Sequence, residues 1–89
     1  MRFCLFIIKD TILGDTIYER VIEFNNRYHL LPCKYYYYPK KKIGKELALE
    51  MLVESDYGYL ENIEEAIKFF HYIYGGMVRL VQEYEILPN

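Results

Sequence analysis

The chain has 89 residues, a mass of 10.8 kDa and a formal net charge of −2 at pH 7. Hydrophobic residues make up 53% of it and charged residues 27%, a balance that predicts a folded chain rather than a disordered one. The length fits one domain over residues 1–89 and excludes a multidomain enzyme, and the composition excludes a collagen and a disulfide scaffold.

Residues 2–9 predict a strand, because an unbroken apolar run extends from Phe3 to Ile8. Both faces of this strand are apolar, so we expect it to be central and covered on both sides. The run is too short for a signal-peptide core or a membrane span, and we expect a cytoplasmic, intracellular protein. Cys4 and Cys33 lie in apolar segments, where cysteine behaves as a small hydrophobic residue.

The next segment predicts a turn at Thr11–Gly14 and then a helix from Asp15 to about Tyr28. Asp15 is a typical N-cap, and apolar residues at positions 17, 21, 24 and 28 recur at helical spacing. Cys33–Tyr38 predicts a second strand, which Pro39 ends. Strand, helix and strand of this length predict a right-handed βαβ unit whose two strands are parallel.

Residues 43–55 predict another helix, with Ile43, Leu47 and Met51 along one line of its surface. Three glutamates share a second line, and they form a candidate acidic face for a partner, with a merely solvated helix face as the alternative. These residues are Glu46, Glu50 and Glu54.

The last third of the chain predicts a helix and a strand. Asn62 and Glu65 form a capping pair at the start of the helix, and Gly75 supplies its stop. Met77–Leu87 predicts a half-exposed edge strand. Its two expected faces are Val78, Leu80, Tyr84 and Ile86 on one side and Arg79, Glu83 and Glu85 on the other.

Together these elements predict a small α/β domain, with α+β as the alternative, in the order β-α-β-α-α-β. Helices are expected to cover a three-stranded sheet in which the direction of the third strand is open. Three strands and three helices can cover both faces and both edges of a sheet in only a few ways. We therefore expect a homodimer.

Charge is divided unevenly along the chain. Residues 1–45 hold nine Lys and Arg against four Asp and Glu, a net charge of +5, and residues 46–89 hold two against nine, a net charge of −7. In the most unusual stretch, lysines bracket four tyrosines, which suits either a charged partner or a solvated strand end. The candidate partner- or nucleic-acid-binding residues are Lys34, Tyr36, Tyr38, Lys40, Lys41, Lys42 and Lys45.

The sequence offers little material for catalysis. It contains no P-loop, no G-x-G-x-x-G and no H-E-x-x-H motif. His29 and Cys33 are four residues apart, but Pro32 between them breaks any shared helical face. We therefore expect no catalytic residue, no cofactor and no metal site.

Two functional hypotheses remain. The first is a non-catalytic interaction or regulatory protein, such as an inhibitor or adaptor of a virus or mobile element, that binds another protein through charged and tyrosine-rich surfaces. The alternative is a nucleic-acid-binding protein that uses the Lys/Tyr segment 34–45.

Overall fold

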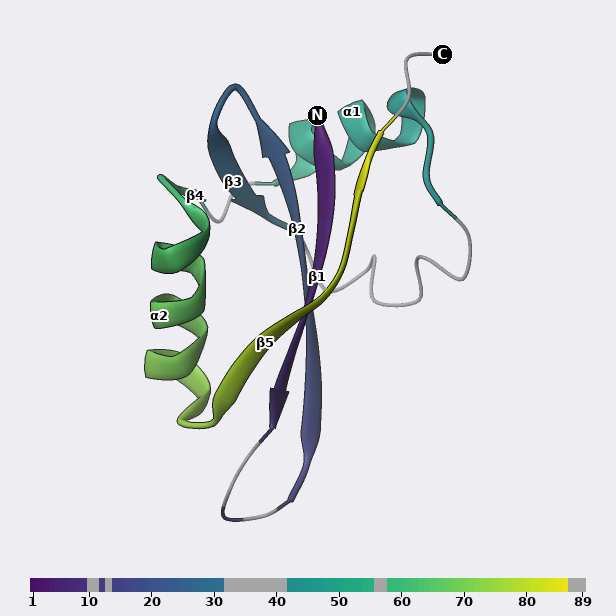
Figure 1. Cartoon of the computed structure of the whole chain (residues 1–89). Helices are drawn as coiled ribbons and strands as arrows, with labels where there is room; N and C mark the ends of the chain where they lie inside the picture. The colour runs from purple at the N-terminus through teal and green to yellow at the C-terminus, as the bar shows by residue number, and fades with distance from the viewer. Residues whose placement is uncertain (10–11, 13, 32–41, 56–57, 87–89) are drawn as a thin grey trace.

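The computed structural model describes residues 1–9, 12, 14–31, 42–55 and 58–86. Within them, five strands form one antiparallel sheet in the order β4-β3-β2-β1-β5, accompanied by two helices (Figure 1). The elements are β1 (Arg2–Lys9), β2 (Thr16–Phe24), β3 (Arg27–Leu30), α1 (Lys45–Glu54), β4 (Tyr59–Leu60), α2 (Ile63–Tyr74) and β5 (Met77–Glu85). The expected α/β domain with a three-stranded sheet and β-α-β-α-α-β order is therefore wrong.

The predicted helix over residues 15–28 is instead the hairpin of β2 and β3. Asn25 and Asn26 connect the two strands, with φ angles of 52° and 64°. Two successive left-handed residues are what a type I′ hairpin turn requires, and asparagine tolerates that conformation better than most residues. The β-branched and aromatic residues of β2 favour a strand as well. Their helix-like spacing was a coincidence of the pattern.

The predicted parallel pairing of residues 2–9 with Cys33–Tyr38 is also wrong, because other strands occupy both edges of β1. β1 pairs antiparallel with β2 on one side and with β5 on the other. The prediction that β1 is an inner strand is confirmed, but it is covered along its length on one face only. Cys4, Phe6 and Ile8 are fully buried on that face, whereas on the other Phe3 is fully buried and Ile7 only partly. The predicted strand Cys33–Tyr38 lies outside the described residues, as do Thr11 and Leu13 of the predicted turn.

Both helices of the second half are confirmed. The Asn62 side chain caps α2 by accepting a hydrogen bond of 2.9 Å from the backbone N–H of Glu65. The Glu65 carboxylate in turn accepts one of 3.0 Å from the N–H of Glu61, one residue before the expected partner. Gly75 ends α2 in the left-handed conformation, with φ of 70°. The residues before α2 contain the two-residue strand β4, which pairs with β3.

β5 is an edge strand among those described, as predicted, but its expected faces are wrong. The register with β1 shifts between Leu5 and Phe6, which leaves Val81 as the extra residue of a β-bulge. Beyond the bulge every side chain changes face. Val78 and Leu80 therefore lie on the opposite face from Tyr84.

The two faces of the sheet carry separate hydrophobic clusters. On one face, Phe3, Ile22 and Tyr84 pack with Ala48 and Met51 of α1. On the other, α2 packs on the strands through the buried residues Cys4, Phe6, Ile8, Val21, Ala66 and Phe70. We call these the α1 face and the α2 face of the sheet. Figure 1 shows the two helices and the sheet on which they pack. None of the helices in the described part of the chain is long and apolar enough to cross a membrane.

Candidate functional site

The structure places only part of the predicted Lys/Tyr site. Lys34, Tyr36, Tyr38, Lys40 and Lys41 lie outside the described residues. Lys42 and Lys45 are described, and both are exposed where the chain enters α1.

Tyr84 of β5 fixes the entry to α1. Its hydroxyl accepts a hydrogen bond of 3.0 Å from the backbone N–H of Ile43, and its ring stacks on Phe3 at 5.1 Å between centroids. The Lys42 ammonium lies 5.5 Å from the centre of the same ring, within cation–π range. Burial raises the pKa of the Tyr84 hydroxyl, which the Ile43 hydrogen bond partly offsets. These contacts with Tyr84 therefore fix the position of Lys42 at the entry to α1.

The predicted acidic residues lie on the outer side of α1 together with apolar neighbours. Val53 is 87% exposed and Leu49 41% exposed. They alternate with three exposed carboxylates, and Leu49, Glu50, Val53 and Glu54 line a shallow depression. We call this outer surface of the helix the acidic α1 face, and it is distinct from the α1 face of the sheet. It is formed by Glu46, Leu49, Glu50, Val53 and Glu54.

Leu49 and Val53 were missed at the sequence level, although a signal was present. Both lie off the helical line of Ile43, Leu47 and Met51 that predicted the buried stripe. Apolar residues on the polar side of an amphipathic helix have no core to enter. Their position is therefore the signal that would have identified them.

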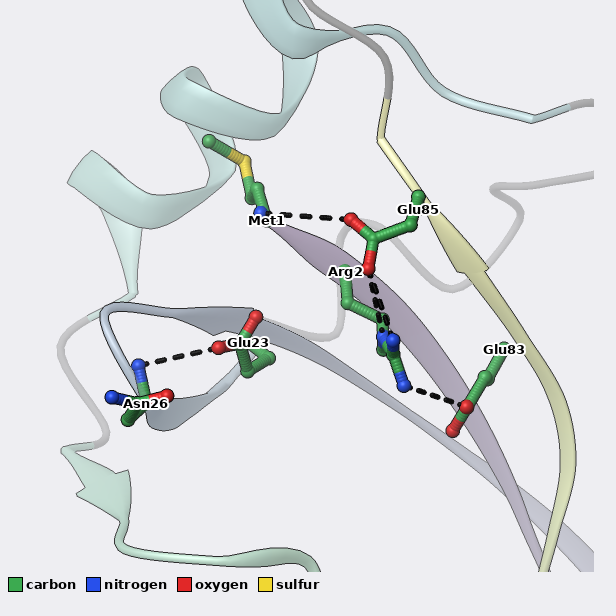
Figure 2. A network of polar contacts seen from close by, with 6 residues as sticks. All are labelled: Met1, Arg2, Glu23, Asn26, Glu83 and Glu85. Carbon is green, nitrogen blue, oxygen red and sulfur yellow. Dashed lines mark hydrogen bonds and ion pairs between the residues drawn. The ribbon is translucent and has the colours of Figure 1, made fainter.

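A polar network ties the first residues of the chain to β5 on the α2 face (Figure 2). The Arg2 guanidinium bonds Glu83 at 2.7 Å and Glu85 at 3.0 Å, and these contacts raise the pKa of Arg2. The Met1 ammonium lies 4.0 Å from Glu85. Nearby, the Glu23 carboxylate accepts a hydrogen bond of 3.2 Å from the N–H of Asn26. The ion pairs of Met1 and Arg2 join the start of the chain to β5, so we assign this network to the stability of the sheet.

The described cysteine and histidines do not form a reactive group. Burial is the main cause that raises the pKa of the Cys4 thiol to about 11, which disfavours the nucleophilic thiolate at neutral pH. Burial and then Arg27 lower the pKa of His29, whose ring lies 5.9 Å from that of Tyr59. His71 Nδ1 lies 2.6 Å from the carbonyl oxygen of Gly76, at the end of α2. Cys33 lies outside the described residues, so its distance from His29 is not part of the structure.

One apolar cleft lies between α2 and the β2–β3 hairpin. Its volume is about 270 Å³, and Leu30, Phe69 and Ile73 line it. At its wall the Tyr74 hydroxyl donates a hydrogen bond of 2.6 Å to Glu19. The Tyr74 hydroxyl and the Glu19 carboxylate therefore bond to each other, and the rest of the lining is apolar.

Across residues 1–9, 12, 14–31, 42–55 and 58–86, the structure brings together no group of three or more His, Cys, Asp or Glu that could hold a metal ion. Comparisons with protein-family models, with curated proteins and with solved structures find no match for this chain.

Proposed function

We propose that this chain is a small non-catalytic interaction protein that binds another protein through the acidic α1 face. One observation carries the proposal: exposed Leu49 and Val53 stand in solvent between exposed carboxylates. Apolar side chains framed by charge are typical of contact surfaces for other proteins. Binding without chemistry is the action of a regulator, an inhibitor or an adaptor.

The charge of the acidic α1 face selects the kind of partner. A helix with apolar side chains flanked by Lys or Arg would cover Leu49 and Val53 while its cations pair with Glu46 and Glu50. A second copy of this chain fits the face poorly, because a two-fold axis would set the glutamates of one α1 against those of the other. The proposed partner is therefore a basic amphipathic segment of a different protein.

Titration with synthetic helices tests this proposal. The probe is an amphipathic peptide with leucines on one side and lysines beside them, and its counterpart carries glutamate in place of lysine. We expect the lysine peptide to bind, as measured by calorimetry, and the glutamate peptide to bind at least about tenfold more weakly. Val53→Ser should weaken binding of the lysine peptide by about tenfold, since it removes roughly 1.5 kcal/mol of apolar burial.

A matched control comes from α2, where Tyr72 is 88% exposed and lies outside the acidic α1 face. Tyr72→Ser should leave peptide affinity unchanged, whereas Glu50→Lys should reduce it as strongly as Val53→Ser. Equal binding of the two peptides, or equal effects of Tyr72→Ser and Val53→Ser, would contradict the proposal.

A further inference from the structure

The two faces of the sheet carry opposite charge. The strand register places Arg2 together with four glutamates on the α2 face, a net charge of −3 from the strands. On the α1 face the described strands carry four cations and no Asp or Glu, a net charge of +4. The acids are Glu19, Glu23, Glu83 and Glu85, and the cations are Lys9, Arg20, Arg27 and Arg79.

The bulge in β5 creates this segregation. With strict alternation along β5, Arg79 would share a face with Glu83 and Glu85. Val81 adds one residue between them, so Arg79 pairs with Ile7 on the α1 face while Glu83 pairs with Cys4 on the α2 face. Because of this one inserted residue, Glu83 and Glu85 lie on the α2 face of the sheet and Arg79 lies on its α1 face.

α1 covers only one end of its face. It packs over Phe3, Ile22 and Tyr84, near the start of β1. Toward the other end of β1, Ile7 is half-buried and belongs to neither hydrophobic cluster. It lies in one row with Tyr18 and Arg79 across three strands.

The neighbouring rows complete a surface that we call the basic sheet face. Lys9 pairs with Met77 in one row, and Arg20 pairs with Leu5 in the other. Tyr18 is 38% and Met77 74% exposed, and Lys9 and Arg79 are exposed as well. The basic sheet face comprises Ile7, Lys9, Tyr18, Arg20, Met77 and Arg79.

We propose that the basic sheet face binds single-stranded nucleic acid. Its cations suit phosphates, and the Tyr18 ring, with the apolar surface of Ile7 and Met77 beside it, suits the flat faces of unpaired bases. An acidic protein segment would use the cations but would gain little from a stacking surface. This binding site is separate from the acidic α1 face and does not depend on the function proposed for it.

Fluorescence anisotropy with a labelled oligouridylate of about 12 nucleotides tests the proposal. If the exposed cations Lys9 and Arg79 each contact a phosphate, affinity should fall about sevenfold between about 50 and about 200 mM salt. Arg79→Gln and Lys9→Gln should each weaken binding and lower the salt slope by about 0.7. Lys68→Gln is the matched control, because Lys68 is an exposed cation on α2, and it should leave both quantities unchanged.

Tyr18 separates nucleic acid from an acidic protein partner. Tyr18→Leu should weaken oligouridylate binding about fivefold or more, while Tyr18→Phe, which keeps the ring, should bind like the unmodified chain. Circular dichroism on both variants checks that the sheet remains folded.

Tighter binding of a polyglutamate probe than of oligouridylate, with no effect of Tyr18→Leu, would overturn the proposal in favour of an acidic protein. Absence of binding at low salt, or equal effects of Lys68→Gln and Arg79→Gln, would overturn it outright. Val53→Ser should leave oligouridylate affinity unchanged, which keeps this test distinct from that of the acidic α1 face.

Discussion

At the scale of single residues, Cys4 shows how position in the sheet sets chemical behaviour. The side chain is fully buried on the α2 face, opposite Val21 and Glu83 in the neighbouring strands. Burial is the largest cause that raises its pKa to about 11, and the nearby carboxylate of Glu83 adds to the effect. A thiol held protonated in this way acts as packing for the sheet.

The raised pKa of Cys4 predicts a loss of stability in alkaline solution. Between the ordinary thiol pKa of 9.0 and about 11, the unfolded chain has released this proton while the folded chain still holds it. The free energy of unfolding should therefore be unaffected by Cys4 below pH 9 and fall by about 1–2 kcal/mol as the pH rises to 11. Urea unfolding at several pH values measures this fall.

Cys4→Ala provides the comparison, since tyrosines and lysines also titrate in this range. The variant should be less stable at neutral pH, because it leaves a small cavity, and its alkaline loss should be smaller by the contribution of the thiol. Identical pH profiles for the two chains would show that burial does not raise the pKa of Cys4.

At the scale of elements, the β2–β3 hairpin shows where the sequence pattern was ambiguous. Apolar residues at positions 17, 21, 24 and 28 fit a helical stripe, yet 17 and 21 also share a face of a strand. Asn25–Asn26 was the deciding signal, because two left-handed residues favour a tight hairpin over a helix end. The capping pair of α2 had no such competing interpretation, and that helix was predicted correctly.

Substitutions at Asn26 test the turn. Asn26→Ala places a Cβ-bearing residue without a local hydrogen-bonding side chain in the left-handed region, and we expect it to reduce the free energy of unfolding by about 1 kcal/mol. Asn26→Gly should be neutral or stabilising, because Asn-Gly is the preferred pair in a type I′ turn. Chemical denaturation of both variants measures the difference. Equal destabilisation by alanine and glycine would argue against a left-handed residue at this position.

The candidate surfaces differ in how far the sequence could predict them. Glu46, Glu50 and Glu54 follow from helical spacing alone, and their helix is present. The basic sheet face depends on which strands are neighbours and on the bulge at Val81. Neither can be derived from alternation along a single strand, so strict alternation assigned Arg79 to the same face as Glu83 and Glu85.

At the scale of the whole molecule, the homodimer expected from the size of the chain stays a prediction. Among the described strands, β5 is a nine-residue edge strand, and edge strands offer backbone groups to a second chain. Sedimentation equilibrium should give twice the mass of 10.8 kDa at high concentration, and amide protection in β5 should rise in parallel. A mass of 10.8 kDa at every concentration would contradict the dimer.

The two helices are attached to the sheet unequally. α2 has a side-chain N-cap and a left-handed C-cap, and it packs Phe70 against Phe6 at 5.3 Å between ring centroids. α1 begins at Gly44 without a side-chain cap, and it buries Ala48 and Met51. At its end the Ser55 hydroxyl donates a hydrogen bond to the carbonyl oxygen of Leu30. Each helix buries two side chains, but α2 packs four further, partly buried apolar side chains against the sheet and α1 only two. With less apolar packing and no side-chain N-cap, α1 should open locally before the rest of the molecule unfolds.

Hydrogen exchange tests this order of opening and connects it to binding. Amides of α1 should exchange faster than those of α2 and β1, and Met51→Ala should accelerate α1 further while changing β1 little. A partner on the acidic α1 face would add its binding energy to the closed form of α1 alone, so the lysine peptide should slow exchange in α1 more than elsewhere. If α1 and β1 exchange at the same rate, with or without peptide, the helix and the sheet unfold as one unit. Binding at α1 would then stabilise the entire fold, because no separate opening of the helix would remain for the partner to suppress.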